Sequence, residues 1–202
     1  MMTRFHAIQF GNSARRGTCP WITKTFPLLL VLLLAAFVPN HADGAELDES
    51  QVKALFLYNF TRYVSWPEGA FANESAPIVI GVAGATPVLG HLRAVAEADP
   101  GEGRPTRVVE YDVTSAPESI HILFVSSRER SRYREHLTRS RGHPVLTVGE
   151  HPSFTNAGGM IHFHLRDNRV RMAIRPAAAR RENIVLSSQL LRLADLLPDN
   201  ME

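Results

Sequence analysis

The sequence predicts an α/β fold: a three-layer sandwich with a mainly parallel sheet, a C-terminal β-hairpin and a closing helix. Short runs of β-branched and apolar residues, typical of strands buried on both faces, alternate with segments of helical period. This alternation ends near the C-terminus, where two strand-like segments flank the turn-forming pair Asp167-Asn168. Strands that alternate with helices form parallel sheets covered on both faces.

The first element of the domain is a predicted helix that begins near residue 52 and is ended by Pro67. At a period of 3.6 residues its apolar face comprises Val52, Leu55, Phe56, Phe60, Tyr63 and Trp66. The opposite face carries Ala54, Tyr58, Thr61 and Ser65. Asn59 falls among the apolar positions. Because a buried amide without a partner costs about 1–3 kcal/mol, we expect Asn59 to be hydrogen-bonded to a fixed neighbour or to face a site.

The remaining elements follow in order along the chain. Strands are predicted over residues 77–83, 107–111, 120–125, 144–148, 160–165 and 169–174. Helices are predicted over residues 87–97, 128–140 and 177–197. Thr86, ahead of Pro87, and Ser127 are suited to cap the first two of these helices. The last helix is apolar almost all round, so we expect it to be buried on more than one side or covered by a partner.

Residues 1–45 have the layout of a secretory signal peptide. Basic residues precede an uncharged apolar run at 26–38, which is short for a membrane span of about 20 residues. We expect cleavage near Ala42 or Ala45, which would release the protein into the periplasm. An uncleaved membrane anchor is the alternative.

Residues 46–202 are expected to form one domain, because a chain of this length buries about two-thirds of its unfolded surface. Four of the 22 Lys and Arg residues and one of the 20 Asp and Glu residues precede residue 46. The domain therefore carries a small negative net charge, which argues against a nucleic-acid partner. Cys19 lies before the apolar run, so the domain has no cysteine and is held together by its core alone.

Few residues have the spacing that catalysis or cofactor binding requires. His162 and His164 are candidate metal ligands, because alternate residues of a strand share a face, but a third ligand such as His121 or His151 is needed. The serines at 126, 187 and 188 lack the glycines of a nucleophile elbow. The turn at 81–84 lacks the spacing of a dinucleotide or phosphate loop, so no cofactor is predicted.

Arginines are concentrated in two segments. Those of the helix at 128–140 fall into two stripes that border a packed face containing Tyr133 and Leu137. The hairpin has a local basic bias, and its candidate partner-binding residues are Arg166, Asn168, Arg169 and Arg171. If the hairpin forms a sheet edge, its backbone could accept a partner strand or pair with a second copy to give a homodimer. A solvated basic face is the simpler alternative.

Three short segments stand in a distinctive order and spacing. They are Tyr58-Asn59-Phe60 leading to Trp66-Pro67, then Gly158-Gly159-Met160-Ile161, and a closing run at 184–194 that contains Ser187 and Ser188. Together they resemble the YfiR family of small periplasmic proteins, over residues 51–194. On the residues alone, Gly158-Gly159 is interpreted as a bend, and the two serines, like Asn59, as internal hydrogen-bonding groups.

The resemblance implies a regulator without enzymatic activity. Such proteins bind the sensory region of an inner-membrane diguanylate cyclase and keep it inactive. An outer-membrane lipoprotein partner relieves this repression, so that cyclic di-GMP and biofilm formation rise. Family members often carry cysteines that form disulfides, one of them near the strand start occupied here by Ile120-His121, and their absence argues against redox-controlled release.

Two other functions remain open on the residues alone. One is a periplasmic small-ligand-binding protein with a crevice at the carboxyl ends of the strands, where open α/β sheets place their ligands. The other is a metal-dependent enzyme built on His162 and His164.

Overall fold

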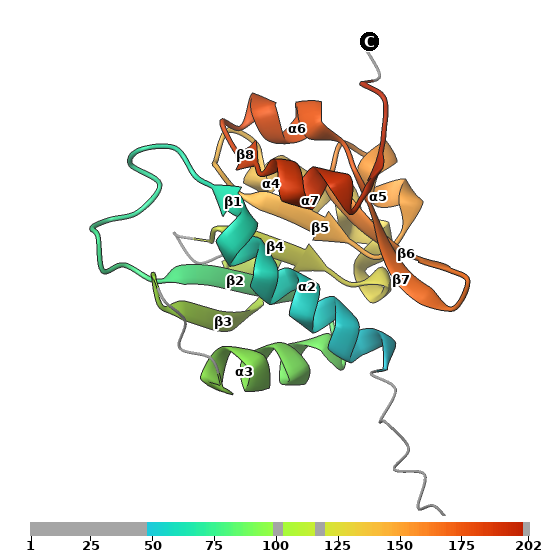
Figure 1. Cartoon of the computed structure of the whole chain (residues 1–202), viewed down its shortest axis with the longest axis horizontal. Helices are drawn as coiled ribbons and strands as arrows, with labels where there is room; N and C mark the ends of the chain where they lie inside the picture. The colour runs from blue at the N-terminus through green and yellow to red at the C-terminus, as the bar shows by residue number, and fades with distance from the viewer. Residues whose placement is uncertain (1–47, 99–102, 116–119, 200–202) are drawn as a thin grey trace, which may run out of the picture. The chain divides into compact units, whose positions relative to one another are not determined.

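The structure, a computed structural model, describes residues 48–98, 103–115 and 120–199. A seven-stranded sheet has the order β3-β2-β4-β5-β6-β7-β9 (Figure 1). Its strands are β2 (Ile78–Ala83), β3 (Thr106–Tyr111), β4 (Ile122–Val125), β5 (Leu146–Gly149), β6 (Ile161–Arg166), β7 (Arg169–Ile174) and β9 (Asp195–Leu196). Strands β2 to β6 are mutually parallel, β7 is antiparallel to β6, and β9 is parallel to β7. This confirms the predicted mainly parallel sheet with its C-terminal hairpin.

Helices cover both faces of this sheet. One face is packed by α2 (Glu49–Tyr63), α3 (Val88–Ala98), α6 (Pro176–Arg181) and α7 (Ser188–Arg192). The other face is packed by η1 (Val113–Ser115), α4 (Tyr133–Ser140) and α5 (Pro152–Asn156). The short η2 (Ser127–Arg132) leads from β4 into α4. A separate two-stranded sheet pairs β1 (Val64–Ser65) with β8 (Val185–Leu186). The three-layer α/β architecture is therefore as predicted.

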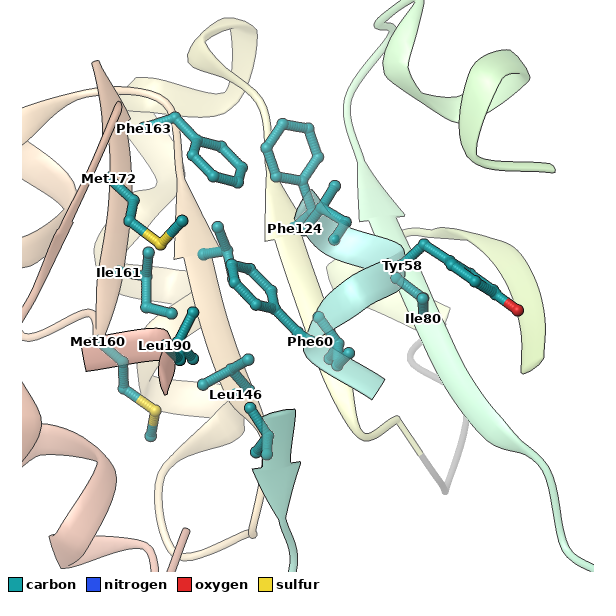
Figure 2. Close-up of a cluster of buried hydrophobic side chains, with 14 of the residues drawn as sticks. Tyr58, Phe60, Ile80, Phe124, Leu146, Met160, Ile161, Phe163, Met172 and Leu190 are labelled. Atoms are coloured by element: carbon teal, nitrogen blue, oxygen red, sulfur yellow. The ribbon is translucent and has the colours of Figure 1, made fainter. Parts of the chain in front are cut away.

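The larger core lies between the sheet and the face covered by α2. Phe60 of α2 stacks on Phe163 of β6 with ring centroids 6.3 Å apart, and Phe124 of β4 completes the aromatic contact (Figure 2). Both faces of the central strands are buried, so their residues alternate between this core and a smaller one beneath α4 and α5. Continuous apolar runs are the pattern that such strands require.

Helix α2 begins with a capping box. The Asp48 carboxylate accepts the backbone N–H groups of Ser50 and Gln51 at 2.6 and 3.0 Å, and Gln51 Oε1 accepts the Asp48 N–H at 3.0 Å. Three backbone donors that the start of the helix would leave unpaired are thereby satisfied.

The predicted buried face of α2 is wrong in part. The buried residues are Lys53, Ala54, Leu57, Tyr58 and Phe60, whereas Tyr63 is exposed. Two residues assigned to the outer face are therefore inside, because α2 also packs along α3 and buries a wider stripe than one sheet contact needs.

The end of α2 also differs from prediction. The helix stops at Tyr63, and the next two residues form β1, so the chain leaves the helix before Pro67. Pairing with β8 gives the backbone groups of β1 the hydrogen-bond partners that they would otherwise find in a longer helix. Asn59 is half-buried, and no hydrogen bond joins its side chain to another described residue, so it is not a fully buried polar staple.

The predicted closing helix at 177–197 is wrong: the segment forms α6, β8, α7 and β9. Asn183 ends α6 in the left-handed conformation, with φ of 57°. Its N–H bonds the Arg180 carbonyl and the N–H of Ile184 bonds the Ala179 carbonyl, which together form a Schellman motif. Ser187 then caps α7 by accepting the Leu190 N–H at 3.2 Å. The apolar residues around the predicted helix are instead distributed over two short helices and two short strands.

The predicted helix at 128–140 is interrupted. Glu129 has non-helical φ and ψ of −92° and 16°, so a 3₁₀ segment precedes α4. Tyr133 and Leu137 are buried between exposed arginines, as the two-stripe pattern predicts. None of the helices in the described ranges is both long and apolar enough to span a membrane.

Candidate functional site

The hairpin of β6 and β7 presents the predicted partner-binding residues on its exposed end (Figure 1). Asp167 and Asn168 have φ of 51° and 55°, the left-handed conformations that a two-residue type I′ turn requires. Arg166 lies directly opposite Arg169 across the turn. The four side chains Arg166, Asn168, Arg169 and Arg171 are exposed, and we call this surface the basic hairpin tip. Its contact with a partner remains a prediction.

His162 and His164 lie on the same face of β6, with ring centroids 5.6 Å apart. His162 is buried, and its Nδ1 shares a hydrogen bond of 2.9 Å with Thr155 Oγ1 on α5. His164 Nε2 lies 3.3 Å from Asp195 Oδ2 on β9. His162 therefore links β6 to α5, and His164 links β6 to β9.

The two histidines considered as a third metal ligand have separate partners. His151 caps α5, because its Nδ1 accepts the Ser153 N–H at 3.1 Å. His121 Nδ1 accepts the Val79 N–H at 3.1 Å, and its Nε2 then carries the proton for the Ala70 carbonyl, also 3.1 Å away. Within residues 48–98, 103–115 and 120–199, no three His, Cys, Asp or Glu side chains are placed to share a metal ion.

Burial makes His162 a source of pH dependence. Its pKa falls from 6.5 to about 4, chiefly because burial disfavours the charged imidazolium and further because His164 and His151 lie nearby. Between these two pH values the unfolded chain binds a proton at His162 that the folded protein does not, so stability falls as the pH falls through this window.

Replacing His162 by glutamine should flatten this dependence. We expect the free energy of unfolding of the wild type to drop more steeply between pH 6.5 and 4 than that of His162→Gln, because the variant has no group to protonate. Urea unfolding at several pH values measures both slopes. The exposed His143 provides the control, since His143→Gln should keep the wild-type slope. Equal slopes for His162→Gln and the wild type would contradict the assignment.

A buried ion pair joins α2 to the carboxyl end of β5, and sequence reasoning missed it. Lys53 Nζ donates to Glu150 Oε1 at 2.7 Å and also contacts Glu49. The side chains of Lys53 and Glu150 are only 10% and 11% exposed. The second oxygen of Glu150 accepts the Ser127 N–H at 2.7 Å, so one carboxylate ties α2, β5 and η2 together. Burial lowers the pKa of Lys53, but the hydrogen bonds that its ammonium donates to Glu150 and Glu49, together with the charges of both carboxylates, outweigh burial and raise the pKa overall.

A crevice of about 580 Å³ lies at the topological switch point. Here β2 lies between β3 and β4, the next two strands along the chain. This is where open α/β sheets place small ligands. Three ionisable groups on its wall contact each other: Glu129 Oε2 lies 3.3 Å from Arg132 Nη1 and 3.2 Å from His136 Nε2. Arg132 also donates to Glu135 at 3.0 Å.

The glycine turns have backbone roles. Gly84 follows β2 with φ of 84°, and an added Cβ would lie 2.5 Å from the buried Ser126 Oγ, so this is a tight turn that closes on β4. Gly158 has φ of 110° and makes the bend that leads into β6. Of the paired serines, Ser187 is the helix cap described above, whereas Ser188 is exposed.

Comparison with known proteins agrees with the three sequence segments. The family model described as YfiR/HmsC-like matches residues 50–195, a span that runs from the first turn of α2 to β9. No curated protein matches the sequence significantly. The family match confirms the resemblance found in the sequence, and the chain belongs to the YfiR/HmsC-like family.

Proposed function

We propose that this protein is a periplasmic regulator that binds the sensory region of an inner-membrane diguanylate cyclase and holds it inactive. Repression would lower cyclic di-GMP and with it biofilm formation. The observation that carries the proposal is membership of the YfiR/HmsC-like family over residues 50–195. The signal-like sequence of residues 1–45, which lie outside the described ranges, supports an export route.

The polar groups of the domain support action by binding rather than by chemistry. His162 bonds Thr155 of α5, Ser187 caps α7, and the Lys53–Glu150 pair joins α2 to the sheet. These groups serve the fold, whereas the basic hairpin tip is exposed and available to a partner. We propose the tip as part of the contact surface.

Repression by binding has a thermodynamic requirement. The protein must bind the inactive state of the cyclase more tightly than the active state, since a ligand of equal affinity for both shifts nothing. Moving the cyclase from almost fully active to almost fully inactive requires a preference of about 10⁴-fold.

Coexpression with a membrane diguanylate cyclase from the same organism tests the function. We expect cellular cyclic di-GMP to fall when the full chain is exported, because the regulator then meets the periplasmic sensory region. A variant without residues 1–45 is the matched control and should leave cyclic di-GMP high, since it stays in the cytoplasm. Unchanged cyclic di-GMP despite correct export of the full chain would refute the proposal.

Release from repression should not depend on redox conditions. Because Cys19 in the leader is the chain's single cysteine, a reducing agent should leave repression unchanged, whereas coexpression of an outer-membrane lipoprotein partner should restore cyclic di-GMP.

A further inference from the structure

The outer edge of β7 is only partly covered. On the side away from β6, β9 pairs with β7 through Asp195 and Leu196, opposite Ala173 and Ile174. Within the described residues no strand lies against the remaining stretch, 169–172. An uncovered strand edge presents a row of backbone donors and acceptors that another strand can use.

The hairpin register decides which backbone groups point outward. In a two-residue type I′ hairpin the residues that flank the turn, here Arg166 and Arg169, form a hydrogen-bonded pair. Bonded and non-bonded pairs alternate along an antiparallel ladder. Val170 and Met172 therefore direct their N–H and C=O groups away from β6. The parallel bridge of Ala173 with Asp195 of β9 uses the Met172 C=O, so the Val170 N–H and C=O and the Met172 N–H remain on the open edge.

The side chains beside this edge carry an unbalanced charge. Arg169 and Arg171 are exposed on one face of β7, and neither has an ion-pair partner among the described residues. Arg166 lies opposite Arg169, and its ion pair within the described structure is with Asp195, at 4.0 Å. The other face of the hairpin tip is apolar, since Val170 is paired with Leu165, which is 54% exposed.

We propose that the outer edge of β7 from Arg169 to Met172 binds an extended segment of a partner protein by β-strand addition. Its partner segment alternates acidic residues, set beside Arg169 and Arg171, with apolar residues set beside Val170 and Met172. This inference rests on the proposed function, because it takes the segment to belong to the sensory region of the cyclase. Backbone hydrogen bonds supply affinity and the alternating side chains supply specificity.

Charge argues against the other occupants. An antiparallel pair of two β7 strands would set the arginines of one copy beside those of the other, and like charges at cross-strand positions repel. The described C-terminus of the chain turns away from this edge, since Asp199 Oδ2 lies 3.2 Å from Arg180 Nη2 on α6. A partner strand with acidic residues satisfies both the open backbone and the free charge.

Proline at position 170 tests the outer edge of β7 without changing the pairing of β7 with β6. Val170→Pro removes an outward N–H, while the ladder to β6 keeps its bonds, because that donor does not serve it. We expect the affinity of the purified, exported protein for the detergent-solubilised cyclase to fall at least about tenfold, with repression lost in cells. Val170→Thr, which keeps the N–H, is the matched control and should bind within about twofold of the wild type.

Charge reversal tests the same edge through its side chains. The double variant Arg169→Glu, Arg171→Glu should bind at least about tenfold more weakly, because repulsion replaces attraction to the acidic segment. The same charge change on α4, Arg134→Glu with Arg139→Glu, should leave binding unchanged. Melting temperatures of all variants identify any that fail to fold. If Val170→Pro does not fold, the binding of the double variant tests the proposed edge.

The outcomes separate this inference from the function on which it rests. If the wild type binds and represses while folded Val170→Pro and the double variant do so equally well, strand addition at β7 is wrong and the proposed function stands. If the wild type itself neither binds nor represses, both proposals fall.

Discussion

Replacing Glu150 by alanine is expected to lower the free energy of unfolding by about 3–5 kcal/mol. The change leaves the buried ammonium of Lys53 with Glu49 as its remaining carboxylate, and Glu49 is half exposed to water. It also removes the acceptor of the Ser127 N–H. An uncompensated buried charge and an unpaired backbone donor are both costly, so the loss should greatly exceed that of an ordinary surface change. Equilibrium unfolding in urea measures it.

A paired replacement tests whether charge is the cause. Lys53→Met with Glu150→Gln removes both charges, and the amide oxygen of glutamine still accepts the Ser127 N–H, so most of the stability should return. Glu135→Ala breaks only the exposed bridge to Arg132 and should cost less than about 1 kcal/mol. A cost for Glu150→Ala no greater than that for Glu135→Ala would show that the buried pair contributes little.

The sheet could be predicted because the apolar pattern of each strand agrees with the strand's burial in the folded protein. Strands such as β2 and β4 are buried on both faces, so every residue is apolar and the run cannot be read as a surface segment. The hairpin was equally clear, since Asp167 and Asn168 accept the left-handed conformations of a tight turn. Exposure of the arginines at the tip followed from the two-residue period of a strand.

The Lys53–Glu150 pair could not be predicted, because its partners are 97 residues apart. A lysine within an amphipathic pattern is ordinarily assigned to the solvent face, and only the tertiary structure brings a carboxylate to meet it. The assignment of Ala54 to the outer face failed for a related reason, because packing along α3, which local periodicity does not show, widens the buried stripe of α2.

The prediction of one closing helix failed for a different reason. The sequence contains the signals that end one helix and begin another, but the continuous apolar pattern outweighed them. Asn183 tolerates the left-handed conformation that ends a helix, and Ser187 is a strong N-cap. The continuous apolar pattern from Ile184 to Leu197 suggested one long buried helix. Pairing of β8 with β1 and of β9 with β7 decided otherwise, and such long-range pairing leaves no trace in a local periodicity.

Phe154 is the second site where a large effect is expected, because its ring fills the space between two glycines. It is fully buried and meets Tyr133 edge-on with ring centroids 4.9 Å apart. A Cβ added at Gly149 or Gly159 would lie 2.3 Å from ring atoms of Phe154. Phe154→Ala should therefore cost about 3–5 kcal/mol, because the removed ring leaves a cavity in the smaller core.

The same contact explains why glycine occupies position 159, and a double-mutant cycle tests it. Gly159→Ala should cost about 1–3 kcal/mol in the wild type, since the methyl group and the Phe154 ring need the same space. In a Phe154→Ala background this cost should fall clearly, because the ring is gone and only the closer-than-usual contact of 3.0 Å with the backbone carbonyl oxygen of residue 154 remains. Gly158→Ala is the control: its cost arises from a φ of 110° with no atom near the added methyl, so it should be the same in both backgrounds. Equal costs for Gly159→Ala in the two backgrounds would mean that the ring does not impose the glycine.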